Sequence, residues 1–317
     1  MTENLNLDSV TVVDCLYQAP GKAGAFLIAE RGRAAFVDNN TVHAVPYLLA
    51  ALEEQGLSPE HVDYLIITHV HLDHAGGTAA LLKHCPNATV LAHPKAARHL
   101  IDPKRLIAGA KAVYGEEAFA QLYGEIEPVD ASRVRVMEDG ETLEWGARTL
   151  RFFYTPGHAS HHFCIYDSGA NGVFTGDAFG LAPRKPGTDE TWFVLCTTAP
   201  PDFDSAEARA TVQKILATGA ARACPAHFGI HQDLRHMALM LLASLERMDI
   251  IIEEALTTNV ADTDLQRFCE DRVIAATEEH LRWCGVENLD AAMEWLGDDP
   301  NINAMGVAHA IRVRRIQ

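Results

Sequence analysis

The chain has 317 residues, of which 48% are hydrophobic, and this length and composition predict an ordinary globular protein with one large domain and a smaller one. The formal net charge of −17 disfavours nucleic acid as a partner, because the two polyanions repel each other. No apolar run approaches the ~20 residues that cross a bilayer and the first ten residues lack signal-peptide features, so we expect a cytoplasmic protein with no membrane partner.

The first part of the chain alternates strand-like and helix-like segments. Short apolar runs bounded by Gly, Asp or Asn predict strands, and apolar spacing of three and four residues predicts helices. The expected strands are 10–17, 24–30, 33–40 and 61–69, and the expected helices are 42–56 and 75–85.

The middle of the chain repeats this order, and the end does not. Helical material around 94–123 precedes strand-like segments at 133–158 and 161–179, which contain the turn signals Asp139-Gly140 and Asn171-Gly172. From about residue 230 only helical spacing remains, at 231–256, 263–285 and 289–296, and the basic tail fits the end of a final helix. We therefore expect a catalytic domain at 1–232 and a helical subdomain at 233–317.

Three histidines and an aspartate lie within six positions directly after the strand expected at 61–69. They are His69, His71, Asp73 and His74. A solvated turn is the alternative for a single one of them, but the density of four lone-pair donors indicates a metal site. The carboxyl end of a strand is also where open α/β sheets bind their ligands.

Three more polar side chains follow apolar strands further along the chain: His158, Asp177 and His227. Each alone has an alternative role as a turn or cap residue. Together with the first cluster they predict a site assembled from several loops at one sheet edge. Imidazole and carboxylate donors without thiolate suit zinc, iron or manganese.

The order H-x-H-x-D-H, T-P-G-H, T-G-D and P-x-H over residues 10–230 resembles the metallo-β-lactamase superfamily, with a glyoxalase II-like set of motifs. The resemblance implies an α/β (α+β) fold, a four-layer αβ/βα sandwich with the metals at one edge, followed here by a C-terminal helical appendage. It also implies two ions. One is held by His69, His71 and His158, the other by Asp73, His74 and His227, and Asp177 bridges them.

This donor set favours hydrolysis. Asp73 and Asp177 offset only part of the charge of two divalent ions, zinc first with iron or manganese as alternatives, so a bound water with a pKa near 7 is expected. The predicted function is a dinuclear hydrolase that attacks an ester, thioester or lactone of a small-molecule substrate with a metal-bound hydroxide. Asp73 and Asp177 are the expected catalytic carboxylates.

Two other classes of function stay open at this stage. One is an iron-dependent oxidoreductase, either like the persulfide dioxygenases, which use one iron, or like the diiron proteins, which have Glu at the position of His71. The other is a non-catalytic ligand-binding regulator. The presence of a suitable residue at all seven ligand positions argues against it. The C-terminal helices offer apolar stripes for covering the site or for a homodimer.

Three neighbouring features have two interpretations each, and a fourth has one. Asp38 either supports the metal loop or begins a plain turn, and Gly76 and Gly77 either allow a close backbone approach or loosen a helix start. His161 is either a proton donor to substrate or a structural histidine. The loop 180–205, rich in Pro and Thr, is expected to shape the pocket.

Overall fold

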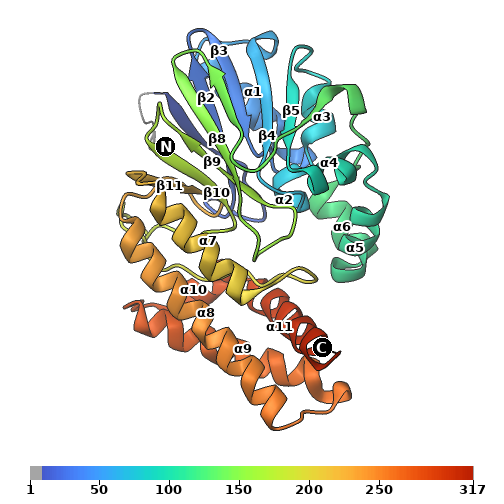
Figure 1. The fold of residues 1–317 in the computed structure, drawn as a ribbon, viewed down its shortest axis with the longest axis vertical. Coiled ribbons are helices and arrows are strands. Elements are labelled where there is room, and N and C mark those ends of the chain that lie inside the picture. The colour runs from blue at the N-terminus through green and yellow to red at the C-terminus, as the bar shows by residue number, and fades with distance from the viewer. Residues whose placement is uncertain (1–8, 317) are drawn as a thin grey trace. The chain divides into compact units, whose positions relative to one another are not determined.

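The computed structural model describes residues 9–316 and divides into two compact units (Figure 1). Unit 1 comprises the described residues of Met1–Tyr154 with His161–Gly176 and Ala220–Gln232, and unit 2 comprises Thr155–Ser160, Asp177–Gly219 and the described residues of Asp233–Gln317. The domain boundary expected at residues 232 and 233 stays a prediction. Part of the expectation about signal peptides falls on residues 1–8, outside the described residues.

The first sheet of unit 1 has six strands in the order of the chain. They are β1 Val10–Asp14, β2 Gly24–Glu30, β3 Arg33–Val37, β4 Val62–Ile67, β5 Thr89–Ala92 and β6 Val134–Val136. The first three strands pair antiparallel, and β3 to β6 pair parallel. The carboxyl ends of β3, β4 and β5 therefore share one edge of the sheet.

The second sheet of unit 1 has five strands in the order β11-β10-β9-β8-β7. They are β7 Thr142–Trp145, β8 Arg148–Tyr154, β9 Phe163–Asp167, β10 Gly172–Gly176 and β11 Arg222–Pro225. The pair β10 and β11 is parallel and the other pairs are antiparallel. The ends of β10 and β11 therefore also lie side by side.

The helices of unit 1 are short. They are α1 Val45–Glu54, α2 Leu72–Ala75, α3 Thr78–Leu82, α4 Pro94–Ile101, α5 Lys104–Tyr114 and α6 Glu116–Tyr123, with 3₁₀ turns η1 Val42–Ala44, η2 Pro59–His61 and η3 Ala131–Arg133. Leu48 of α1, Leu81 of α3 and Leu100 of α4 belong to one core cluster with residues of β2 to β5, so these helices cover one face of the first sheet.

The other face of the first sheet packs on the second sheet. Phe26 and Phe174 meet edge to face there, with ring centroids 5.2 Å apart. Alternate residues of β3 serve the two cores: Phe36 faces the helices and Val37 faces the second sheet. Burial on both faces explains why the central strands read as continuous apolar runs, and each buried Phe contributes ~1.5–3 kcal/mol of transfer free energy.

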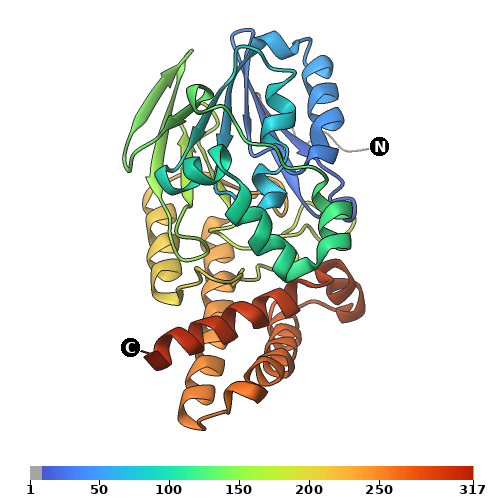
Figure 2. The ribbon, with the colours of Figure 1, turned by 90° about the vertical axis from the view of Figure 1, so that its right-hand side faces the viewer.

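Unit 2 is mostly helical. Its helices are α7 Ser205–Ala217, α8 Leu234–Thr257, α9 Asp262–Trp283, α10 Leu289–Leu296 and α11 Asp299–Ile316. Figure 2 shows α8, α9 and α11 packed together. The loop that precedes α7 has only isolated bridges, such as Leu181 to Leu195, and its Phe193 joins an apolar core with Leu281 of α9 and Leu296 of α10.

These elements confirm the predicted α/β sandwich with C-terminal helices. Three helices were not expected: α2, α7, and α11 beyond its basic end. The strand β5 was not expected either. Among the described helices, none combines the length and the apolar composition needed to span a membrane.

Candidate metal centre

The turn that carries the first histidine cluster is fixed by the loop after β3. β4 ends at Ile67, and the short helix α2 presents Asp73 and His74. The backbone N–H groups of Asn39 and Asn40 donate to the carbonyl of His74 at 2.9 and 3.1 Å. The side-chain amide of Asn40 donates to the Asp73 carbonyl at 2.8 Å. The backbone of the predicted ligands is therefore held from a neighbouring strand end.

Asp38 supports this turn and does not merely begin one. Its buried carboxylate accepts the backbone N–H and the hydroxyl of Thr68, each at 2.9 Å, and lies 2.9 Å from His74 Nδ1. A carboxylate only accepts hydrogen bonds, so His74 must donate through Nδ1. Its other nitrogen, Nε2, is then the one with a lone pair.

Gly77 is explained by close backbone approach. Its N–H donates to the Asn40 carbonyl at 2.7 Å, and a Cβ at this position would stand 2.7 Å from the Thr41 carbonyl oxygen. Any side chain would push the two loops apart. Gly77 therefore allows a close backbone approach, as the first of its two interpretations held.

The second half of this cluster comes from β11. His227 follows the end of β11 by two residues, and its Nδ1 lies 2.7 Å from the carbonyl oxygen of Lys22. Because a carbonyl only accepts, His227 also keeps its lone pair on Nε2. The Nε2 atoms of His227 and His74 lie 3.3 and 3.7 Å from Asp73 Oδ2. Asp73, His74 and His227 thus form a group able to hold a metal ion.

The ring nitrogens of His69 and His71 are a second pair of donor atoms that lie close together in unit 1. His69 Nε2 and His71 Nδ1 lie 3.0 Å apart, and the Thr68 hydroxyl lies 3.1 Å from His69 Nδ1. Two nitrogens bound to one tetrahedral zinc at 2.0–2.1 Å stand about 3.3 Å apart. The donor separations of 3.0, 3.3 and 3.7 Å in unit 1 bracket that value, so the donor set fits metal ions.

His158 and Asp177 lie in unit 2 and repeat the same arrangement. His158 Nδ1 is 2.7 Å from the hydroxyl of Thr197 and 3.4 Å from its carbonyl oxygen, so Nδ1 is the donor and Nε2 keeps its lone pair. His158 Nε2 lies 3.6 Å from Asp177 Oδ2, and both side chains are buried. Unit 1 thus gathers five of the seven predicted ligands and unit 2 the other two.

Several aromatic residues near the cluster were missed from the sequence or left undecided. The ring of His161 is half-buried, with its centroid 5.5 Å from that of His71 and 6.2 Å from that of His99. The hydroxyl of buried Tyr123 lies 3.1 Å from that of Tyr17. Burial, followed by the proximity of Tyr17 and of the Asp73 charge, raises the pKa of Tyr123 far above its ordinary value. No periodicity or motif marks Tyr17, His99 or Tyr123, whereas His161 follows the T-P-G-H motif.

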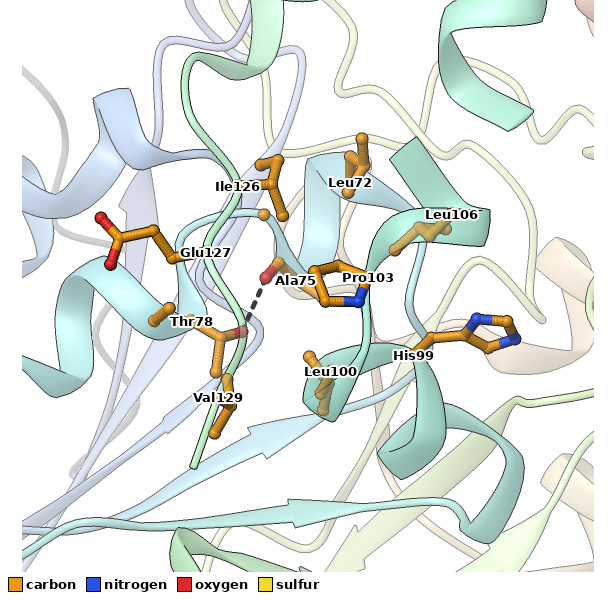
Figure 3. A pocket seen from close by; sticks show the side chains of 12 residues that line it. Leu72, Ala75, Thr78, His99, Leu100, Pro103, Leu106, Ile126, Glu127 and Val129 are labelled. Atoms are coloured by element: carbon orange, nitrogen blue, oxygen red, sulfur yellow. Dashed lines mark hydrogen bonds between the residues drawn. The ribbon is translucent and has the colours of Figure 1, made fainter. Parts of the chain in front are cut away.

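A small pocket lies beside the turn at α2. Figure 3 shows Leu72, Leu100 and Leu106 around it, and the Thr78 hydroxyl donates within it to a backbone carbonyl at 2.7 Å. Its two titratable side chains, His99 and Glu127, point outward on opposite sides. The pocket therefore presents an apolar lining without a reactive group.

No thiol competes with the histidine cluster for a chemical role. The seven cysteines all lie in the described part of the chain and form no disulfide, and among them only Cys284 is not fully buried. Burial raises the pKa of the Cys284 thiol to about 11, so it is protonated at neutral pH.

A family model described as the metallo-beta-lactamase superfamily matches residues 8–227. This match covers more than half of the chain, and the protein therefore belongs to that superfamily.

Curated relatives match the chain over part of their length. The metallo-beta-lactamase fold-containing protein ST1585 of Sulfurisphaera tokodaii is 33% identical over 125 residues, 38% of this chain and 46% of that protein. A hydroxyacylglutathione hydrolase of Aeromonas hydrophila is 28% identical over 153 residues, 48% of this chain and 44% of that enzyme. Thioesterase pkgB of Emericella nidulans is 32% identical over 126 residues, 40% of this chain and 26% of that protein. Each match spans less than half of the relative.

One solved structure resembles nearly the whole chain. The metallo-beta-lactamase family protein TTHA1429 of Thermus thermophilus superposes with a TM-score of 0.65 at 20% identity and covers 98% of this chain and 94% of its own. At this identity the likeness shows the fold alone. It includes the C-terminal helices, because the superposition extends over nearly all residues.

Proposed function

We propose that the protein is a dinuclear metal-dependent hydrolase of an ester, thioester or lactone. The observation that carries this proposal is the orientation of His74 and His227. Asp38 and the Lys22 carbonyl each bind the Nδ1 side of one ring, so that both lone pairs on Nε2 face the Asp73 carboxylate. Hydrogen bonding of the far ring nitrogen is typical of histidines that bind metals.

The ligand assignment is part of the proposal. His69, His71 and His158 would hold one ion, Asp73, His74 and His227 would hold the other, and Asp177 would be a ligand that both share. The 3.0 Å approach of His69 Nε2 to His71 Nδ1 supports the first set, and Asp177 directly follows the last residue of β10, the strand beside β11. Nitrogen and oxygen donors suit zinc first, with iron or manganese as alternatives.

The chain's own groups have distinct tasks in this proposal. Two bound ions supply an acidified water and a counter-charge for a substrate oxygen. Asp73 is the accessible member of its group, since 21% of its side chain is exposed while His74 is fully buried. Its carboxylate can therefore meet the substrate, and the oxygen that would not bind the ion can accept a proton from water. Asp38 and Thr68 hold His74 and His69 in place from behind.

The relatives and the charge support the proposed substrate class. A hydroxyacylglutathione hydrolase and a thioesterase are among the similar proteins, which supports a thioester or a related acyl bond. The net charge of −17 supports a small molecule over nucleic acid. We further propose a cytoplasmic protein without a membrane partner, and a homodimer as the association state to test by light scattering.

The test is to strip the protein of metal, confirm the loss by elemental analysis, and assay thioesters, lactones and phosphodiesters. Zinc, manganese or ferrous iron should restore hydrolysis. Asp177→Ala should lower the metal content and abolish turnover, whereas Asp290→Ala, an exposed residue of α10, should change neither.

Four results would contradict the proposal. Hydrolysis by verified metal-free protein, or an acyl group trapped on a side chain, would overturn the mechanism. One iron per chain with oxygen uptake would favour an iron-dependent oxidoreductase, to which the same donors are suited. Metal binding without turnover on any substrate would favour a ligand-binding regulator.

A further inference from the structure

A buried segment of unit 2 is held by side chains of two helices. Cys196 and Thr198 are almost completely buried, yet they belong to no helix or strand. The Cys196 N–H donates to the hydroxyl of Ser244 of α8 at 3.1 Å. Buried backbone groups need such partners, since leaving one without a hydrogen bond costs stability. Side chains take the place of a neighbouring strand here.

Asn303 of α11 makes most of these contacts. Its Oδ1 accepts the Thr198 N–H at 2.7 Å and its Nδ2 donates to the Cys196 carbonyl at 3.0 Å. The Thr198 hydroxyl donates to the Asn303 backbone carbonyl at 2.8 Å. The carboxamide therefore binds the segment at two points, as a peptide group of a neighbouring strand would. Two-point binding fixes the direction of the segment as well as its distance.

The backbone of α11 lies directly against the backbone of the segment 196–198. Gly306 is three residues after Asn303 and so on the same side of α11. A Cβ at Gly306 would stand 1.3 Å from the carbonyl oxygen of Thr198. Only a glycine allows the contact, so Asn303 and Gly306 together define where the segment 196–198 runs.

The residue between the two held positions contacts a predicted metal ligand. The Thr197 hydroxyl lies 2.7 Å from His158 Nδ1 and donates to the Asp177 carbonyl at 3.4 Å. A hydroxyl that donates to a carbonyl still has lone pairs to accept the Nδ1–H of the imidazole. Thr197 thereby sets both the tautomer and the ring orientation of His158, whose Nε2 faces Asp177 Oδ2 at 3.6 Å.

We propose that Asn303 and Thr197 are positioning residues for His158, and that α11 thereby sets the metal affinity of the site. Asn303 holds the backbone on both sides of Thr197, and Thr197 holds the imidazole. This inference rests on the proposed function, in which His158 is a metal ligand. It assigns a role to the C-terminal helix that a packing helix alone would not have.

The experiment titrates metal-free protein with cobalt(II), whose visible spectrum reports ligand number and geometry. Asn303→Ala and Thr197→Val should each lower cobalt affinity about 10-fold or more, the usual effect of removing a group that orients a metal ligand. Thr197→Ser keeps the hydroxyl and should restore wild-type affinity. Asn301→Ala, an exposed residue of the same helix, is the matched control and should bind like the wild type.

The outcomes separate the two proposals. A wild-type protein that binds no cobalt overturns the proposed function itself. A wild-type protein that binds cobalt, together with unchanged affinity in either Asn303→Ala or Thr197→Val, overturns only the positioning role. Should Asn303→Ala fail to fold, Thr197→Val and Thr197→Ser decide, because they leave the contact with α11 in place, and equal affinity of these two variants overturns the proposal.

Discussion

Replacing Asp38 with Ala should destabilise the protein even when no metal is present. The carboxylate accepts two hydrogen bonds from Thr68 and one from His74, all at 2.9 Å, and the loss leaves the Thr68 N–H and His74 Nδ1 without this acceptor in the core. Each buried donor so deprived costs about 1–3 kcal/mol. Ala also tolerates the backbone angle φ of +57° poorly, which adds about 1 kcal/mol. The expected loss is about 3–7 kcal/mol in the free energy of unfolding.

Asp38→Asn should separate stability from metal binding. Asn has nearly the same size and tolerates positive φ, and its Oδ1 can still accept from the Thr68 N–H. Its NH₂ group then faces His74 Nδ1, and two donors cannot pair. The ring relieves the conflict by moving its proton to Nε2, the nitrogen that faces Asp73. We therefore expect a small loss of stability and a 10–100-fold loss of metal affinity.

Urea denaturation of the metal-free variants, followed by circular dichroism, measures the first effect, and zinc competition titration of the folded protein measures the second. The exposed Asp290→Ala serves as the control for both. An Ala variant within about 1 kcal/mol of the wild type would refute the hydrogen-bond argument. An Asn variant with wild-type zinc affinity would refute the tautomer argument.

Two further changes test the packing and the electrostatics of the described residues. Gly306→Ala should cost about 3 kcal/mol or more, because its Cβ would overlap the Thr198 carbonyl, whereas Gly109→Ala, in open space on α5, should be neutral or stabilise by about 0.5–1 kcal/mol. Equal melting temperatures of the two variants would contradict this placement of α11. Burial lowers the pKa of His280 from 6.5 to about 4, so the unfolded chain takes up a proton between these pH values and the folded chain does not. Stability should therefore fall as the pH drops from 6.5 to 4, by up to ~3 kcal/mol. His280→Gln should flatten this part of the profile of unfolding free energy against pH, measured by urea denaturation. An unchanged profile would assign the pH dependence to other groups.

The central strands and the ligand motif were predictable because their signals are local. β3 and β4 are buried on both faces, so nearly every residue is apolar, and the polar residues that follow them stand out. The helix α11 was predictable only at its basic end. Its sequence contains Pro300, Asn303 and Gly306, which are weak helix formers. Pro300 is tolerated in the first turn, and the other two are explained by contacts with Thr198.

Of the groups that orient the ligands, only Asp38 was named from the sequence, and its role was left open between two interpretations. Asp38 lies 36 residues from His74, Thr197 lies 39 residues from His158, and the Lys22 carbonyl lies 205 residues from His227. Each is a single polar group in a turn or loop, a setting in which such residues are common. Their role depends on a partner that only the tertiary structure brings near.

The two units are interleaved along the chain, which passes from one to the other after Tyr154, Ser160, Gly176, Gly219 and Gln232. A genetic exchange confined to 233–317 would replace α8 to α11 and leave the rest of unit 2 unchanged. The incoming helix would then need a side-chain amide at the position of Asn303 and a glycine at the position of Gly306 to fit against the unchanged Thr198. We therefore expect that exchanging the C-terminal helices alone with those of a relative would disturb the contacts with Thr198. By the same reasoning, we expect residues 303 and 306 to change together with the loop that carries Thr197.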